Sequence, residues 1–245
     1  MVESARSNSP GGLSSADPGV VVQLEALGGD VRELQRKLWV AAKRSPGRRF
    51  HALFNRICRS DVLREAWVRV QKNKGAAGVD KQTLAAVREY GVDRLLGELQ
   101  RDLRDGSYRP QPVRRVEIPK PSGGKRPLGI PTVSDRIVQQ AARIVLEPIF
   151  EVDFLEVSYG FRPRRKALDA KEVLRRSFIG GHQFVFEADI RNYFSEIDHE
   201  RLLTLVAERV SDRRVLALIR KWLKAGVMLE GEFRRTLAGT PQGGK

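Results

Sequence analysis

The sequence predicts an α+β fold, in which a helical first half gives way to short extended segments. Three observations lead to this prediction. Apolar residues recur at helical spacing through residues 30–107, and prolines and glycines punctuate the apolar runs of residues 108–130. A succession of strand, two helices and hairpin follows near the end. With 245 residues, 41% of them hydrophobic, the chain can bury a sizeable core.

The first part of the chain divides into a tail and a run of helices. Residues 1–29 are rich in Ser, Gly and Pro, so we expect a disordered tail there. From Asp30 the segment DVRELQRKLWVAAKR places apolar residues at helical spacing with basic residues between them. Further helices are expected within residues 48–57, 60–75 and 91–106.

A hairpin is expected next, in the segment YRPQPVRRVEIPKPSGGKRPLGIP. Prolines argue against a helix here, and Pro-Ser-Gly-Gly at residues 121–124 separates two short apolar runs, as a hairpin turn does. The following helix is expected over residues 134–150, with Ser134 as its N-terminal cap and apolar residues along one face.

The last third of the chain predicts a strand, two helices and a second hairpin. Residues 182–190, HQFVFEADI, read as a short apolar strand. Helices are expected over residues 199–210 and 211–226. The final hairpin is expected within residues 227–239, with its turn at Glu230-Gly231.

The chain is strongly basic, with 45 Lys and Arg against 30 Asp and Glu and a net charge of +15. Residues 1–30 hold one basic and four acidic residues, so the basic excess lies in the remainder. Such a charge attracts polyanions, nucleic acid among them. The single cysteine, Cys58, excludes an intrachain disulfide and a Cys-based metal cluster, and no apolar run has the length of a membrane span. These features indicate an intracellular protein.

An acidic residue stands at the end of the predicted strand, in the segment FVFEADIRNYF. Strand alternation puts Glu187 and Asp189 on one face, where two carboxylates can bind a divalent cation. A cation there suits phosphoryl-transfer chemistry in a protein that attracts phosphate. The alternative is structural, with Asp189 capping the turn into the next helix and Glu187 solvated. From these residues alone the structural role is favoured.

Two other segments favour a phosphate site. Lys120 and Arg126 flank the tip of the first hairpin, so its bend brings two cations towards one anion. The final stretch, GTPQGGK, combines glycines, which allow close backbone approach, with Gln242, whose amide can bind a base or a sugar. Each segment alone also fits an ordinary solvated turn, but the three together favour a nucleotide site.

Five stretches of the chain occur in an order that resembles a known family. They are LREAWVRVQKNKGAAGVD, YRPQPVRRVEIPKPSGGKRPLGIPTVSDRIVQQAARIVLEPIFEVDF, SYGFRPRRKALDA, EADIRNYFSEIDHERLL and GTPQGGK. This series is similar to the motifs of group II intron reverse transcriptases, also called intron maturases. The resemblance implies a right-hand polymerase-type fold, with residues 30–107 as a helical N-terminal extension, 108–176 as fingers and 177–245 as an incomplete palm.

The activity that this resemblance implies is that of an RNA-directed DNA polymerase. Such an enzyme uses deoxynucleoside triphosphates and an RNA template, and it works by two-metal nucleotidyl transfer with Mg²⁺ or Mn²⁺. The implied partners are intron RNA, template RNA and an RNA–DNA duplex, without a membrane and with no oligomeric state specified. The implied location is the bacterial cytoplasm, with an organelle as the alternative.

The resemblance also assigns roles to individual residues. Asp189 matches the first catalytic, metal-binding aspartate, and the backbone carbonyl of Ile190 is a further metal ligand. The nucleotide-binding positions are Lys120 and Arg126 on the triphosphate, Phe194 under the sugar, where it excludes a 2′-hydroxyl, and Gln242 against the incoming nucleotide. The residues expected to contact RNA or template are Arg114, Arg115, Arg162, Arg164 and Arg165.

The chain departs from the family pattern at several positions. Arg164 stands where the family usually has Gly, and Ser195 stands where an acid is frequent, which leaves Asp198 as the nearest other carboxylate. The chain ends at Lys245, before the Tyr-Ala-Asp-Asp turn that completes the family's metal site. We therefore expect little or no polymerase activity from this chain alone.

Other hypotheses remain open at this point. The basic helical region and the fingers can act as a non-catalytic module that binds intron RNA and assists splicing, with an affinity that falls as salt rises. The chain can also be the product of a disrupted reading frame, whose open sheet edge favours aggregation. A two-metal nuclease is disfavoured because the sequence shows no second cluster of acids.

Overall fold

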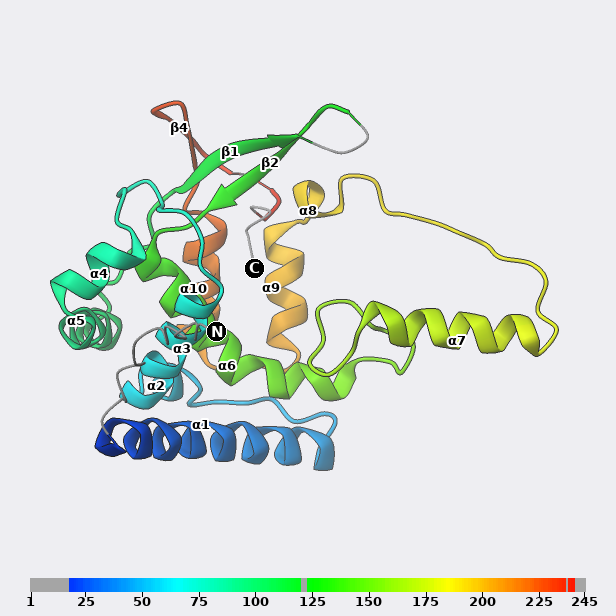
Figure 1. The fold of residues 1–245 in the computed structure, drawn as a ribbon, viewed down its shortest axis with the longest axis horizontal. Coiled ribbons are helices and arrows are strands. Elements are labelled where there is room, and N and C mark those ends of the chain that lie inside the picture. The colour runs from blue at the N-terminus through cyan, green and yellow to red at the C-terminus, as the bar shows by residue number, and fades with distance from the viewer. Residues whose placement is uncertain (1–17, 120–122, 237, 241–245) are drawn as a thin grey trace, which may run out of the picture.

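The computed structural model describes residues 18–119, 123–236 and 238–240, and only the backbone of residues 18–28. Its helices are α1 (Pro18–Arg44), α2 (Phe54–Ile57), α3 (Ser60–Lys72), α4 (Leu84–Tyr90), α5 (Val92–Asp105), α6 (Val133–Phe150), the 3₁₀ turn η1 (Glu151–Asp153), α7 (Ala167–Ile179), α8 (Tyr193–Glu196), α9 (His199–Ala207) and α10 (Arg213–Leu223). Its strands are β1 (Val113–Pro119), β2 (Lys125–Ile130), β3 (Val227–Leu229) and β4 (Glu232–Arg234). This mixture confirms the predicted α+β class (Figure 1).

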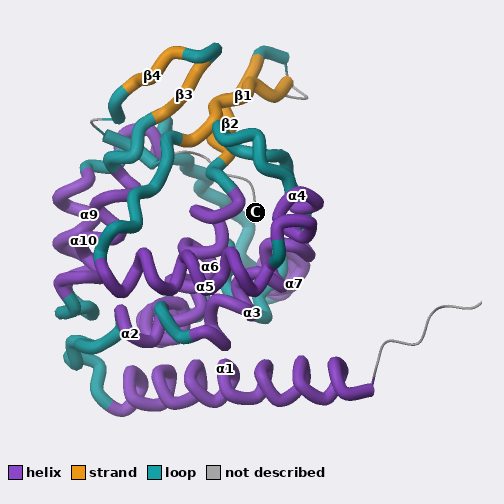
Figure 2. The backbone as a smooth tube through the Cα atoms, turned by 90° about the vertical axis from the view of Figure 1, so that its left-hand side faces the viewer, coloured by secondary structure: helices purple, strands orange, loops and turns teal. Residues whose placement is uncertain are grey.

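Helix α6 forms the centre of the hydrophobic core. Its side chains Ile137 and Ile144 are fully buried, and α1, α2 and α3 pack against it. Figure 2 shows α6 between α1 on one side and the sheet on the other. The same core includes Val215 and Leu218 of α10, so it runs across the predicted boundary at residue 107. The division into extension, fingers and palm therefore does not separate independent cores.

The two predicted hairpins are confirmed, and they lie in one sheet of order β2-β1-β3-β4. Strands β1 and β2 are antiparallel, with Arg114 opposite Ile130, whereas β1 and β3 are parallel, with Val113 opposite Val227. The second hairpin turns at Glu230-Gly231, where φ is +51° and +88°. Positive φ at both turn residues matches the twist of a two-residue hairpin.

Helix α6 begins after Thr132, so the predicted Ser134 cap is wrong. Thr132 has extended backbone dihedrals, and its Oγ1 accepts a hydrogen bond from the Asp135 backbone N–H at 3.1 Å. This is the geometry of an N-cap. Ser134 lies inside the first helical turn, where its side chain cannot take that role.

Residues 18–29 belong to α1, which corrects the disordered tail that composition predicted over residues 1–29. Proline is well tolerated in the first turn of a helix, and the stretch after Pro18 contains Gln, Leu, Glu and Ala, which favour helix. A low content of large apolar residues therefore did not exclude a helix here. Residues 1–17 lie outside the described residues.

Residues 182–190 do not form the predicted strand. They run from α7 to α8 as an irregular segment (Figure 1). The exposed fractions of Phe184 and Phe186 in this segment are 95% and 92%. A strand is stable only when a neighbour pairs with its backbone, and in the described chain the strands of the sheet pair only with one another. Helix α7 and this segment project together from the body, and we call residues 167–192 the arm.

Candidate nucleotide-binding site

A pocket lies where the first hairpin, the second hairpin and the turn after the arm meet. Its volume is about 190 Å³, below the roughly 300–1,000 Å³ of typical small-molecule sites. It is lined by Val113, Arg115, Pro127, Gly129, Ser195, Val227, Thr236, Ala238, Gly239 and Thr240. The pocket can therefore hold one base- or sugar-sized group, and it brings together three of the segments expected to bind a nucleotide.

The end of the described chain is hydrogen-bonded to the turn at α8. The Gly239 N–H donates to the Ile197 carbonyl at 2.8 Å, and the Thr240 N–H donates to the Phe194 carbonyl at 2.7 Å. The ring of His199 bonds to the same glycine, with Nε2 2.7 Å from the Gly239 carbonyl oxygen. These contacts hold two segments together that are distant in sequence.

Gly239 permits this close approach. Its φ is +83°, and a Cβ at this position would lie 2.7 Å from the Ser195 carbonyl oxygen and 2.9 Å from that of Phe194. Residues with side chains rarely adopt this backbone conformation, and no Cβ fits such a gap. Gly239 thus lets the backbone of this segment approach the backbone of the α8 turn closely.

Phe194, the expected sugar-packing residue, lies on α8 beside the pocket. Its side chain is 43% exposed, and its ring meets that of Tyr193 edge-on with centroids 5.4 Å apart. Phe194 is therefore accessible to a ligand rather than a member of the core. Gln242, two residues beyond Thr240, lies outside the described residues.

The basic residues of the first hairpin differ in their surroundings. Arg126 is exposed on β2, and Arg115 lines the pocket. Arg114 instead donates from Nε to the Ala77 carbonyl at 3.0 Å, which ties β1 to the loop before α4. Lys120 lies outside the described residues. Among the hairpin residues expected to bind phosphate or RNA, Arg115 and Arg126 are thus the described ones that face the pocket or the solvent.

Arg162 is bonded inside the protein rather than presented to a partner. Its side chain is 6% exposed and pairs with Glu151 at 2.8 Å. Its guanidinium also donates to the carbonyls of Leu155 and Ser158, at 2.7 and 2.9 Å. These bonds occupy all three guanidinium nitrogens. Such surroundings do not favour the predicted RNA contact by Arg162.

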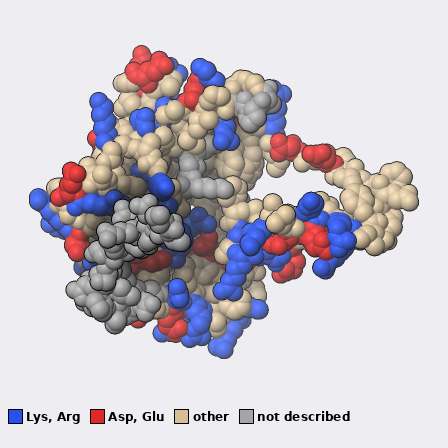
Figure 3. Space-filling model, viewed as in Figure 1, with Lys and Arg blue, Asp and Glu red and all other residues tan. Residues whose placement is uncertain are grey.

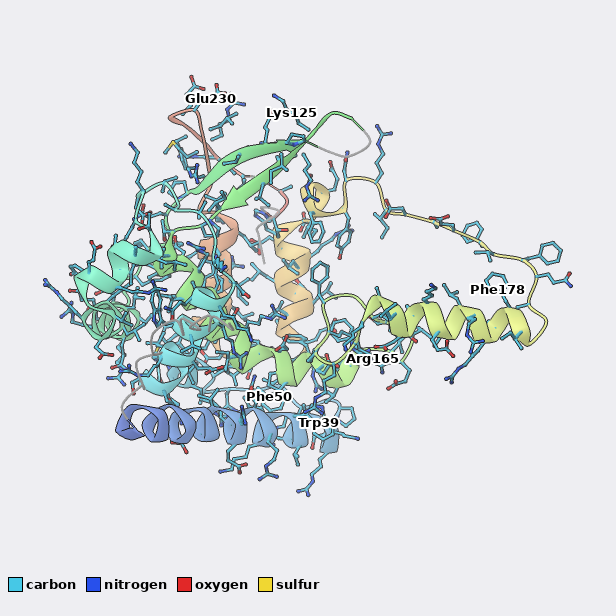
Figure 4. All side chains as sticks on the ribbon, viewed as in Figure 1. Trp39, Phe50, Lys125, Arg165, Phe178 and Glu230 are labelled. Atoms are coloured by element: carbon cyan, nitrogen blue, oxygen red, sulfur yellow. The ribbon has the colours of Figure 1, made fainter. Side chains whose placement is uncertain are left out.

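Arg164 and Arg165 lie in the turn that precedes the arm. Figure 4 shows Arg165 at the base of the arm and Phe178 near the far end of α7. Arg165 hydrogen-bonds to Glu156, which lowers the pKa of that carboxyl, and lies over the Tyr159 ring at 5.5 Å. Arg164 is exposed with φ of +62°, a conformation that glycine adopts most readily. The position at which the family usually has Gly thus keeps a left-handed backbone in this chain.

Asp189 lies in the arm, exposed together with Glu187 and Ile190. It does not cap α8, whose N-cap is Asn192, and without a strand no alternation places Glu187 beside it.

Asp198 is engaged as the N-cap of α9, where it accepts a backbone N–H at 2.7 Å. Within residues 18–119, 123–236 and 238–240, no three His, Cys, Asp or Glu side chains converge as metal ligands. Asp189 can supply one ligand, but the described residues do not fit a complete metal site.

Two buried polar residues, Asp135 and His199, have structural partners that the sequence does not indicate. Asp135 accepts hydrogen bonds from the hydroxyls of Tyr108 and Thr132, at 2.6 and 2.8 Å. Burial raises the pKa of Asp135, and burial followed by the charge of Asp135 raises the pKa of Tyr108. His199 is the second such residue. An Asp in a first helical turn and a lone His both fit ordinary helix chemistry, so neither carried a signal of its distant partner.

Basic side chains are distributed over several elements of the surface. Figure 3 shows Lys and Arg on the face of Figure 1 with Asp and Glu among them, and along α7 the two signs are mixed. On that helix Glu172 pairs with both Arg175 and Arg176. The charge on this face therefore forms a patchwork rather than one basic stripe. None of the helices in the described residues has the length and hydropathy needed to cross a membrane.

Residues 118–245 match the reverse transcriptase (RNA-dependent DNA polymerase) family. Because this match covers more than half of the chain, the chain belongs to that family. Enzymes of this family generally use divalent metal ions and deoxynucleoside triphosphates.

Several relatives are intron-encoded proteins. Group II intron-encoded protein LtrA of Lactococcus lactis subsp. cremoris is 40% identical over 198 residues, which is 80% of this chain and 32% of LtrA. Protein YkfC of Escherichia coli (strain K12) is 40% identical over 226 residues, 87% of this chain and 58% of YkfC. Nuclear intron maturase 1, mitochondrial, of Arabidopsis thaliana is 32% identical over 94 residues, 38% of this chain and 13% of that protein. The chain thus spans about a third of LtrA and less than two thirds of YkfC, and the resemblance drawn from the motifs is confirmed.

Proposed function

We propose that this chain forms the fingers and the beginning of the palm of an RNA-directed DNA polymerase of the group II intron type. The observation that carries this proposal is the contact of the Phe194 turn with Gly239 and Thr240, next to the pocket below the first hairpin. Membership of the reverse transcriptase family supports the polymerase chemistry. The likeness to LtrA and to an intron maturase supports the group II intron class.

The incoming deoxynucleoside triphosphate is proposed to bind at the mouth of this pocket. Lys120 and Arg126 pair with its phosphates, because arginine can bind two oxygens at once and lysine adds a point charge. Phe194 packs against the sugar and leaves no room for a 2′-hydroxyl, and Gln242 lies against the nucleotide. These roles select a deoxynucleotide as substrate.

The metal ion proposed for this function is Mg²⁺, with Mn²⁺ as a substitute. Asp189 and the Ile190 carbonyl are its proposed ligands, since Mg²⁺ prefers oxygen donors and commonly binds one or two carboxylates. The described residues bring no further acids to Asp189. We therefore propose that this chain alone has little or no polymerase activity.

The partners proposed for the chain are intron or template RNA and an RNA–DNA duplex. A net charge of +15 favours such polyanions. Because LtrA and YkfC are bacterial proteins, we place the function in the bacterial cytoplasm, with an organelle as the alternative. The second candidate function is a non-catalytic module that binds intron RNA and assists splicing, which the lack of converging acids in the described chain favours.

Binding of a deoxynucleoside triphosphate in the presence of Mg²⁺, measured by equilibrium dialysis, tests the nucleotide roles. We expect Arg126→Gln to weaken binding about tenfold, the loss of one charge-assisted contact. Lys125→Gln is the matched control, because the neighbouring Lys125 pairs with Glu117 at 3.2 Å and should change affinity little. Equal affinities for wild type and Arg126→Gln contradict the assignment.

Primer extension on an RNA template separates the two candidate functions. We expect RNA binding that weakens as salt rises, without extension by the chain alone. Robust extension that Asp189→Asn abolishes contradicts the proposed inactivity. RNA binding by a wild-type chain that binds no deoxynucleoside triphosphate favours the splicing-assisting module.

A further inference from the structure

His199 is a buried residue at the start of α9, with only 6% of its surface exposed. Its Nε2 lies 2.7 Å from the Gly239 carbonyl oxygen. A carbonyl oxygen can only accept a hydrogen bond, so Nε2 carries the hydrogen and donates it. The ring is therefore engaged with the backbone of a residue that lines the candidate nucleotide pocket.

Gly239 is fixed from both of its backbone polar groups. Its N–H donates to Ile197 and its carbonyl accepts from His199, while the next residue, Thr240, donates to Phe194. The bonds to Ile197 and Phe194 join backbone to backbone and do not depend on side-chain identity. The bond from His199 to the Gly239 carbonyl depends on the histidine side chain.

His199 lies in the first turn of α9, and a side-chain cap stabilises this turn. Asp198 caps α9 through a 2.7 Å hydrogen bond from a backbone N–H, and His199 is the first residue of that helix. The ring therefore starts from a fixed backbone position. Gly239, at φ of +83°, has no Cβ to restrict its rotation. The bond from His199 acts together with the Thr240–Phe194 bond to orient the planar peptide group that contains the Gly239 carbonyl.

We propose that His199 is a positioning residue that sets the backbone direction of Gly239 and Thr240, two residues that line the candidate nucleotide pocket. Through this bond His199 determines how Gly239 and Thr240 approach the Phe194 turn, and thereby the affinity of the site for a deoxynucleoside triphosphate. The second part of this inference rests on the proposed function. His199 itself is buried and acts through Gly239, without contact to the nucleotide.

A matched pair of variants isolates the hydrogen bond. In His199→Gln the amide nitrogen is as many bonds from Cα as Nε2 of histidine, so it can still donate to the Gly239 carbonyl. In His199→Asn the amide nitrogen is one bond shorter and falls short of it. Both replacements are neutral amides, so polarity is held constant while reach changes.

Amide hydrogen exchange at Gly239 and Thr240 in the full chain, without nucleotide, decides the positioning role. We expect His199→Asn to speed exchange at both amides about tenfold, the effect of one lost hydrogen bond, and His199→Gln to stay close to wild type. Wild-type exchange rates in His199→Asn overturn the proposal. Thermal melting of each variant shows whether any change is local to this segment.

Equilibrium dialysis of a deoxynucleoside triphosphate with Mg²⁺ tests the link to the nucleotide. We expect binding to weaken about tenfold in His199→Asn and to recover in His199→Gln, with both variants folded at the temperature of the assay. Faster exchange with unchanged nucleotide affinity overturns this link. A wild-type chain that binds no nucleotide counts against the proposed function, and the exchange rates still decide the role of His199.

Discussion

The hydroxyl of Tyr108 donates a 2.6 Å hydrogen bond to the buried carboxylate of Asp135. The same carboxylate accepts the backbone N–H of Gln111 at 3.1 Å, and the Tyr108 oxygen accepts from Trp222 Nε1 at 3.2 Å. Three elements meet here: the segment before β1, the first turn of α6 and the last turn of α10. This network therefore anchors the first hairpin, which covers the pocket, to the core of the protein.

Replacing Tyr108 with Phe removes this anchor without leaving a large cavity. We expect the free energy of unfolding to fall by about 1–3 kcal/mol, because a buried carboxylate loses a donor that water cannot replace. Urea denaturation measures the change. Tyr90→Phe is the control, because Tyr90 bonds to Glu98 at the exposed surface and its loss should alter stability little. Similar effects of the two variants would contradict the role assigned to Tyr108.

The raised pKa of Asp135 gives the protein a specific pH dependence. Folding raises this pKa above its ordinary value of 3.8, chiefly by burial, so the folded state binds the proton more tightly than the unfolded state. The stability contributed by protonated Asp135 is therefore complete below about pH 4 and is lost as the pH rises through the folded-state pKa. We expect wild type to lose stability relative to Asp135→Asn as the pH rises above about 4 in urea unfolding. A difference that is constant or grows in favour of wild type would contradict this.

Gly239→Ala should disrupt the contact between the final segment and the α8 turn. The added Cβ meets the Ser195 carbonyl oxygen at 2.7 Å, so backbone must move as well as adopt an unfavourable φ. Gly231→Ala is the matched control, with φ of +88° but no atom within 4 Å of its Cβ. The control should cost about 1–2 kcal/mol from backbone strain alone, and Gly239→Ala should additionally speed amide exchange at Thr240. Unchanged exchange at Thr240 in Gly239→Ala would argue against the close contact.

We expect Arg162 to stabilise the fold and Arg164 to contact RNA. Arg162→Ala leaves Glu151 without its buried partner and is expected to lower the free energy of unfolding by about 3 kcal/mol. Arg164→Ala should leave the free energy of unfolding unchanged. It should reduce the slope of the logarithm of RNA affinity against the logarithm of salt concentration by about one. Denaturation curves and RNA titrations at several salt concentrations measure these effects. Loss of RNA affinity by a stably folded Arg162→Ala variant would reverse the assignment.

The exposed aromatic residues of the arm should contribute little to folding stability. We expect Phe184→Ser combined with Phe186→Ser to change the free energy of unfolding by no more than about 0.5 kcal/mol, because neither ring packs against the core. Leu53→Ala, at a fully buried position, should cost about 2–5 kcal/mol. The double variant should also bind less of a hydrophobic dye, since it removes exposed apolar surface. A large loss of stability in the double variant would show that the arm packs against the body in solution.

Local sequence was sufficient for the elements whose stability is local. The Pro-Ser-Gly-Gly stretch and the Glu230-Gly231 pair specify turns through their own backbone preferences, so both hairpins were predicted. The parallel pairing of Val113 with Val227 was not, because nothing in either strand encodes a partner so distant in the chain. The segment around Phe184 does not form the predicted strand for the same reason: apolar, β-prone residues form a strand only where a neighbour accepts their hydrogen bonds.

By itself the sequence determined the class of protein, because ordered motifs and a basic composition are properties of the chain that need no coordinates. It also determined which residues were candidates for binding phosphate and metal. Only the tertiary structure decided how those candidates are used: Arg162 turns inward to Glu151, Arg164 faces solvent, and His199 reaches Gly239. The physical reason is that residue type sets which bonds a side chain can form, whereas long-range packing sets which partner is within reach.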